Sequence, residues 1–176
     1  MNCCTTKTST LEVSLSVDGS SAGEHVSECD MQPCGQCQSR SRPVSRKTVL
    51  LMLKPDLLEQ ARHGNYGFCF TPGCPVVYFE EEGKQQFTID DLRIRVGLKV
   101  AEDPIPLCYC FGFDESHLRE EIARTGQTTI PETITKLIRE GMCACDARNP
   151  SGMCCLGEVS KTAKLLKIRF HKVHRS

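Results

Sequence analysis

Residues 68–79 read Phe68-Cys-Phe-Thr-Pro-Gly-Cys-Pro-Val-Val-Tyr-Phe79. Two short apolar runs, 68–70 and 76–79, flank a segment whose prolines and glycine favour a tight turn. The pattern predicts two strands joined by a turn, with a cysteine at each end of that turn, Cys69 and Cys74. A loop of this kind can bring two sulfur atoms to one metal ion.

A second pair of cysteines precedes this loop. Cys34 and Cys37 form Cys-x2-Cys, and 31 residues separate them from the Cys-x4-Cys of Cys69 and Cys74. Zinc takes four soft ligands in tetrahedral geometry, and a two-residue spacer lets both sulfur atoms face one ion. We therefore predict a zinc-ribbon-like site that is structural, because four thiolates leave no position for water. Buried unligated thiols, a thiol–disulfide pair at Cys34 and Cys37, and copper capture beginning at Met31 are weaker alternatives.

Further cysteines lie beyond residue 100. Cys108-Tyr-Cys110 precedes Cys145 by 34 residues, and Cys154-Cys155 follows. Each iron of a 2Fe-2S cluster takes two thiolates, so Cys108 and Cys110 would serve one iron, and Cys145 with Cys154 or Cys155 the other. We favour Cys155, because it would open a helix whose N-terminal amides stabilise a thiolate. Cys154 as the ligand and a second structural zinc remain alternatives.

The composition narrows the possible functional classes of this protein. The 176 residues include 13 cysteines, and 22 basic residues balance 22 acidic ones. Zero net charge disfavours nucleic-acid binding, and no apolar run approaches the roughly 18 residues of a membrane span. The N-terminus lacks a signal-peptide pattern, so we expect a cytoplasmic protein, where thiols serve metal or redox chemistry rather than disulfides. No phosphate-binding glycine loop or cysteine–histidine pair favours catalysis, and we expect no enzyme.

The local patterns predict an α+β protein of two small domains. The expected strands are 48–53, 68–70, 76–79, 87–89 and 92–96, and the expected helical segments are 56–61, 115–124 and 130–140. The expected division is a disordered tail over 1–33, a β-rich zinc-binding domain over 34–102, a helical 2Fe-2S domain over 103–160 and a basic tail over 161–176. Domains this small need stabilisation beyond their hydrophobic core. A metal centre would supply it by cross-linking the chain.

Several motifs occur together in one order: residues 68–79, Arg95-Val-Gly97, Leu107-Cys-Tyr-Cys-Phe-Gly-Phe113 and Asn149-Pro-Ser-Gly-Met-Cys-Cys155. In this the chain resembles the N-terminal region of archaeal-type CopZ copper chaperones. The resemblance implies a zinc-binding domain followed by a helical 2Fe-2S domain similar to bacterioferritin-associated ferredoxin. It assigns zinc to Cys34, Cys37, Cys69 and Cys74, and the cluster to Cys108, Cys110, Cys145 and Cys155.

Full-length members of that family also carry a heavy-metal-associated domain that binds Cu(I). Only 17 residues follow Val159, too few for such a domain, so we expect copper to be delivered by a separate copper chaperone domain or received by a copper-transporting ATPase. The expected function is metal handling with one-electron transfer, including reduction of Cu(II) to Cu(I). The alternatives are a ferredoxin-like electron carrier for a redox enzyme, and a thiol-based metal sensor that uses Cys3, Cys4 and Cys29.

Overall fold

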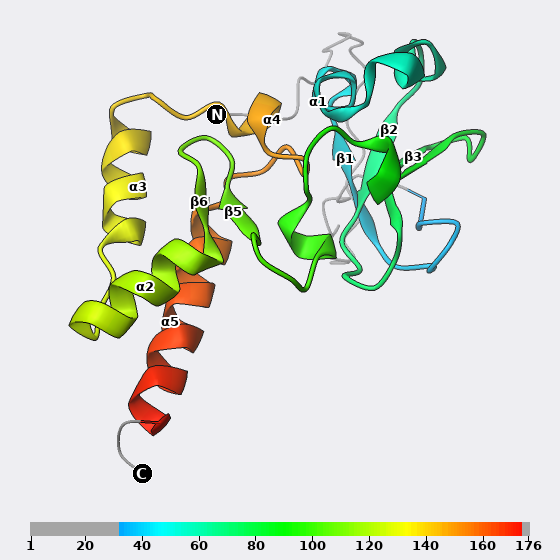
Figure 1. Cartoon of the computed structure of the whole chain (residues 1–176). Helices are drawn as coiled ribbons and strands as arrows, with labels where there is room; N and C mark the ends of the chain where they lie inside the picture. Colours follow the sequence, from blue (N-terminus) through cyan, green and yellow to red (C-terminus); the bar gives the residue numbers. More distant parts are fainter. Residues whose placement is uncertain (1–31, 174–176) are drawn as a thin grey trace, which may run out of the picture.

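The computed structural model describes residues 32–173 as a sheet half (residues 32–102) and a helical half (103–173), shown in Figure 1. The fold is α+β, as predicted. The tail expected over 1–33 falls almost wholly outside the described residues, as do Cys3, Cys4 and Cys29. No helix among the described residues is long and apolar enough to cross a membrane.

The sheet half contains four antiparallel strands in the order β1-β2-β3-β4. They are β1 (Ser41–Val44), β2 (Tyr66–Cys69), β3 (Val76–Glu80) and β4 (Gln86–Thr88). The predicted strand pair around residues 70–75 is therefore β2 and β3, and Phe68 lies opposite Tyr78. Because the turn between β2 and β3 is short, Cys69 and Cys74 lie at the same end of these two strands.

The two faces of this sheet bury different side chains. Helix α1 (Arg46–Met52) and the 3-10 helix η1 (Pro55–Ala61) pack on one face, against an apolar core that includes Phe68 and Tyr78. The other face buries Phe79 together with the cysteines of the sheet half. Alternation along a strand separates neighbours such as Phe68 and Cys69 in this way.

The segment 48–53, predicted as a strand, is helical instead. The Ser45 side chain accepts a hydrogen bond from the Thr48 N–H and so caps α1. Val49, Met52 and Leu53 follow the three- and four-residue spacing of a buried helix face. A short continuous apolar run fits either structure, and here the cap and this spacing decide.

The predicted strand over 92–96 is also wrong. Its one pairing within the described residues is an isolated bridge between Leu92 and Leu53. The Arg93 side chain instead donates hydrogen bonds to the carbonyl groups of Leu50 and Leu53, which ties the segment to the end of α1. Two further 3-10 helices, η2 (Ile89–Asp91) and η3 (Gly97–Lys99), flank it.

The helical half starts with a hairpin, β5 (Pro106–Cys108) and β6 (Phe113–Asp114). It continues with α2 (Glu115–Thr125), α3 (Ile130–Arg139), α4 (Cys145–Arg148) and α5 (Leu156–Val173). Asp114 caps α2 as predicted, and Gly126 ends it in the left-handed conformation. The core includes Leu118, Ile122 and Ile134.

Helix α5 extends through most of the expected basic tail. It runs to Val173, and Ala163 and Leu166 are buried in the same core as α2 and α3. Residues 161–173 are thus part of the helical half, with their basic side chains on the other faces of the helix. The basic residues favour a tail, although the apolar spacing of Leu165, Leu166 and Ile168 also allows an amphipathic helix, and the helix is what forms.

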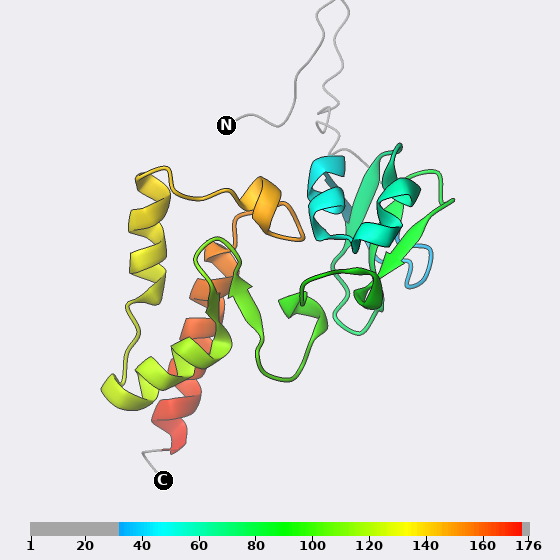
Figure 2. The ribbon, with the colours of Figure 1, turned by 45° about the horizontal axis from the view of Figure 1, so that its top comes forward.

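Contacts join the two halves at the loops around α4. The Thr48 hydroxyl on α1 donates to the Asp146 carbonyl, and the Tyr78 hydroxyl on β3 donates to the Pro150 carbonyl at 2.7 Å. A Cβ atom at Gly97 would lie 1.8 Å from the Pro106 carbonyl oxygen, so only glycine fits there. Both views of the ribbon show α4 lying between the sheet and the three longer helices (Figures 1 and 2).

Candidate metal centres

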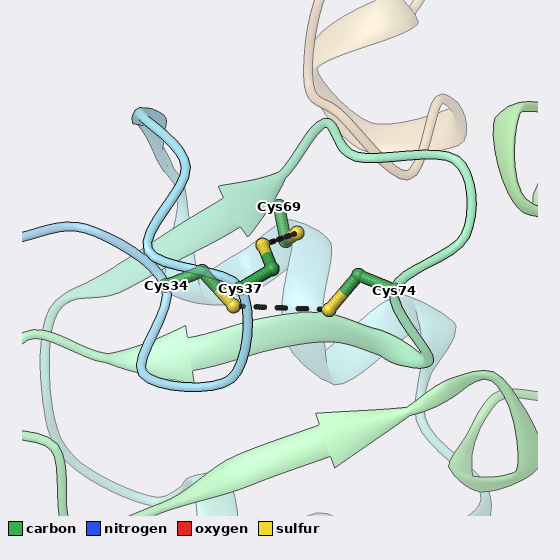
Figure 3. Close-up of side chains that lie close together, drawn as sticks. All are labelled: Cys34, Cys37, Cys69 and Cys74. Atoms are coloured by element: carbon green, nitrogen blue, oxygen red, sulfur yellow. Dashed lines mark hydrogen bonds between the residues drawn. The ribbon is translucent and has the colours of Figure 1, made fainter.

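The first candidate centre is formed by four cysteines of the sheet half, which we call the first quartet: Cys34, Cys37, Cys69 and Cys74. Two come from the turn before β1, one from the end of β2 and one from the loop before β3. Their sulfur atoms all lie within 4.8 Å of one another. Figure 3 shows the four side chains pointing toward a common centre from these three segments.

The spacing of these sulfur atoms fits a tetrahedral zinc ion. The sulfur atoms of Cys37 and Cys69 are 3.6 Å apart, and those of Cys34 and Cys74 are 4.0 Å apart. Zn–S bonds of about 2.3 Å in a tetrahedron separate the sulfur atoms by about 3.8 Å. Three of the four cysteines are buried and Cys37 is half-buried, so the chain closes the site against water.

Thr71, in the turn between β2 and β3, supports this site. Its hydroxyl lies 3.3 Å from the Cys37 sulfur, and this contact, with the Ser39 backbone N–H, lowers the pKa of Cys37 to about 6. Lys99 donates a hydrogen bond to the Thr71 carbonyl at 2.7 Å and so fixes the turn. The spacing of the cysteines does not single out Thr71, because its role depends on how the turn places it beside Cys37.

Burial has the opposite effect on two other thiols of the first quartet, because it raises their pKa values. Desolvation raises the pKa of Cys34, and it raises the pKa of Cys74 to about 12. A low-dielectric site disfavours the charged thiolate unless a cation balances it. Buried thiols at this spacing are therefore suited to a divalent cation.

The second candidate centre lies in the helical half and consists of Cys108, Cys110, Cys145 and Cys155, the second quartet. The sulfur atoms of Cys110 and Cys145 are 3.6 Å apart. An interaction with the Cys155 thiol lowers the pKa of Cys108 to about 6. Among the described residues, only the first quartet has all its sulfur atoms within 4.8 Å of one another. The sulfur atoms of the second quartet are more widely spread, with Cys110 and Cys145 in contact.

The pairing differs from the expected one. We expected Cys108 with Cys110 and Cys145 with Cys155, but the sulfur contact in the structure, between Cys110 and Cys145, joins the β5–β6 hairpin to α4. The backbone N–H of Ala144 also points at the Cys110 sulfur, at 3.4 Å.

Cys154 and Cys155 occupy different environments. Cys155 is buried in the core of the helical half, and its carbonyl accepts the first hydrogen bond of α5, from Val159. Cys154 is exposed. Cys143, the additional thiol before α4, is half-buried.

The loop before Cys154 is held by Asn149, a residue that the sequence analysis quoted without assigning it a role. Its side chain donates to the Met153 carbonyl at 2.7 Å and accepts from the backbone N–H and the hydroxyl of Ser151. Arg148 donates to the Cys110 carbonyl at 3.1 Å. These bonds fix the backbone on both sides of the second quartet.

Comparison with known proteins relates this geometry to a family. Residues 31–93 match the zinc binding domain of the CopZ type. The copper chaperone CopZ of Archaeoglobus fulgidus is 32% identical over 149 residues, which cover 79% of this chain and 70% of that protein. This chain belongs to the CopZ family. The X-ray structure of the CopZ N-terminal domain from the same organism matches with a TM-score of 0.61, and the match covers 73% of this chain and 95% of that one.

The CopZ zinc binding domain match contains the whole first quartet and ends at residue 93, before Cys108. The first quartet therefore lies in a region whose family description names zinc. The second quartet has no such description, and its assignment depends on the geometry of this chain.

Proposed function

We propose that the chain is a carrier rather than an enzyme: a zinc- and 2Fe-2S-binding protein that handles copper in the reducing cytoplasm and reduces Cu(II) to Cu(I). The observation that carries this proposal is the presence of two cysteine quartets in one member of the CopZ family. The first quartet would hold a structural zinc, and the second a redox centre. The N-terminal thiols Cys3, Cys4 and Cys29 have no assigned role.

The first quartet fits zinc by number, chemistry and spacing. Cys34, Cys37, Cys69 and Cys74 supply four thiolates at tetrahedral separations, and structural zinc sites are closed in this way. The sheet half is small, and a bound ion would cross-link three of its segments. We therefore assign zinc a stabilising role there.

The second quartet fits a 2Fe-2S cluster better than a second zinc. Cys110 contacts Cys145 and Cys108 interacts with Cys155, and a two-iron cluster takes two thiolates at each iron. Burial favours Cys155 over Cys154 as the fourth ligand. When bound, such a cluster supplies one-electron transfer, the chemistry that reduction of Cu(II) to Cu(I) requires.

The core of the helical half limits the contact of this site with water. Leu107, Leu118 and Val159 pack in the same core as Cys108, Cys110 and Cys155, and the Asn149 side chain holds the loop before Cys154. Polar and apolar surroundings of this kind tune the potential of iron–sulfur centres. The partner that fits this role is a copper-carrying chaperone domain or a copper-transporting ATPase.

A ferredoxin-like electron carrier without a copper role is the second candidate, and the buried second quartet favours it equally. The two functions differ in what the reduced chain does with copper. The metal-loaded chain should be purified anaerobically, reduced with dithionite, freed of excess reductant and mixed with Cu(II). The copper role predicts about one Cu(I) formed per chain, with the visible colour of the oxidised protein returning.

The matched control is Cys155→Ser, which removes a ligand of the second quartet and keeps the first. It should form no Cu(I) above the level of free thiols. If the intact reduced chain leaves Cu(II) unreduced while it still reduces a one-electron acceptor such as cytochrome c, the carrier function replaces the copper function.

A further inference from the structure

We propose that the chain holds Cu(I) as cargo in the cavity between its two halves, with the Cys154 thiol and the Met153 thioether as ligands. This inference rests on the proposed copper function and deepens it, because it names where the cargo binds. The carrying observation is that both soft side chains line one cavity, next to a cysteine of the second quartet.

The cavity has a volume of about 490 Å³ and takes its walls from both halves of the chain. Phe70, Val96 and Leu98 line it from the sheet half. Leu107 and Tyr109 line it from the β5–β6 hairpin. Apolar walls of this kind limit contact between a bound ion and water while leaving an opening through which the ion can enter.

Met153 and Cys154 are the two residues with soft side chains that line the cavity beside Cys155. Cys154 is exposed and Met153 is 39% exposed, so neither is occupied in packing the core. Thiolate and thioether sulfur are soft ligands that select Cu(I) over harder cations. The Glu158 carboxylate lines the same cavity and adds negative charge near a monovalent cation.

The cavity also reaches the second quartet. Cys155 lines it together with its neighbour in the chain, Cys154. Copper held at Cys154 would therefore lie beside the proposed redox centre without using one of its ligands. This placement gives the exposed Cys154 a role, which a fifth cysteine beside a four-thiolate centre otherwise lacks.

The chain offers a matched pair of control residues. Met142 and Cys143 repeat the Met-Cys sequence before Cys145, as Met153 and Cys154 do before Cys155. Met142 is 61% exposed and Cys143 is half-buried, and neither lines the cavity. Any general affinity of exposed sulfur for Cu(I) would appear equally in both pairs.

The test measures Cu(I) affinity of the full-length, metal-loaded chain by anaerobic competition with the chromophoric chelator bicinchoninate. Cys3, Cys4 and Cys29 are replaced by serine throughout, so that they do not compete. Cys154→Ser should weaken Cu(I) binding by about tenfold or more, and Met153→Leu should weaken it by a smaller factor. Met142→Leu and Cys143→Ser should leave it unchanged.

Zinc content, iron content and the visible spectrum of each variant keep the two proposals distinguishable. The cargo site is overturned if the cavity variants retain the parental affinity, if the control variants lose as much affinity, or if Cys154→Ser loses its iron. A parental chain that lacks zinc and iron contradicts the proposed function instead, whatever its affinity for copper.

Discussion

Cys69 is one of the two fully buried cysteines of the first quartet. It is fully buried at the end of β2, and its sulfur lies 3.6 Å from that of Cys37. We expect Cys69→Ser to abolish zinc binding and to lower the free energy of unfolding of the sheet half by several kcal/mol. Structural zinc in small domains contributes about 10 kcal/mol or more of apparent binding free energy. Loss of the zinc therefore lowers the stability of the folded domain.

Metal analysis together with thermal unfolding measures both effects. Cys143→Ser is the control, since it removes a thiol that is half-buried and lies outside both quartets. Normal zinc content in Cys69→Ser would rule out the four-thiolate assignment.

The neighbouring thiols Cys154 and Cys155 should behave oppositely. Cys155→Ser removes the partner of Cys108 and should eliminate visible absorption and bound iron, whereas Cys154→Ser should keep both. The visible spectrum of the anaerobically purified variants is the measurement. Loss of colour in Cys154→Ser alone would move the fourth ligand to Cys154.

Residue spacing predicted that the cysteines of the first quartet converge. It did not predict which sulfur atoms of the second quartet lie in contact. The spacing of Cys34, Cys37, Cys69 and Cys74 was enough to predict that they converge, because turn residues accompany each pair. The pairing of Cys110 with Cys145 was not predictable, because it depends on how the hairpin faces α4. The supports from Thr71 and Asn149 involve ordinary polar residues, which no spacing rule distinguishes.

Among the elements, the connection between α2 and α3 depends on one carboxylate. Glu121 accepts hydrogen bonds from the hydroxyl groups of Thr128 and Thr129 and from the Thr129 N–H. The Thr128 bond is the main cause of the lowered pKa of Glu121. Hydrogen bonds to a charged group are worth about 1.5–3 kcal/mol when buried, so at this partly exposed site Glu121→Gln should cost about 1–2 kcal/mol at pH 7.

The sign of the pH dependence follows from the lowered pKa. The carboxylate stabilises the folded chain fully above the unfolded pKa of about 4.3, and this contribution is lost as the pH falls through the lower folded pKa. The difference in unfolding free energy between parent and variant, from denaturant titrations at pH 7 to 3, should therefore shrink in acid. A difference that stays constant would show that the charge of Glu121 is not involved.

Helix α5 shows two faces with different expected sensitivities. Leu166 is 9% exposed and packs in the core, whereas Ile168 is 54% exposed. We expect Leu166→Ala to destabilise the helical half by about 2–4 kcal/mol, and Ile168→Ala to stay within about 0.5 kcal/mol. Equal effects in denaturant unfolding would mean that residues 161–173 do not pack as described.

Element prediction succeeded where caps and breakers mark both ends. Asp114 and Gly126 delimit α2, and a helix of that length has a clear period. It failed over 48–53, where a short apolar run is ambiguous, and over 161–173, where the basic residues obscured the positions of Ala163 and Leu166. The Ser45 cap and the spacing of the buried residues decide the first case, and the packing of Ala163 and Leu166 in the core of the helical half decides the second.

At the scale of the whole molecule, the sheet half holds the loops that carry the second quartet. The Tyr78 hydroxyl donates to the Pro150 carbonyl, five residues before Cys155. Tyr78→Phe should cost about 1 kcal/mol and speed the release of iron to a chelator, because the loop loses its anchor. Tyr66→Phe removes a similar bond, to the His63 carbonyl within the sheet half, and should leave iron release unchanged. Equal rates of iron release in the two variants would show that the Tyr78 bond from the sheet half does not help to hold the iron.

The proposed function requires two different inorganic centres in one chain, and X-ray absorption at the zinc and iron edges of the intact, anaerobically purified protein distinguishes them. We predict zinc surrounded by four sulfur atoms at about 2.3 Å, and about two irons per zinc, each with sulfur ligands and a neighbouring iron. Nitrogen or oxygen ligands on the zinc, or a second zinc in place of the iron pair, would contradict it.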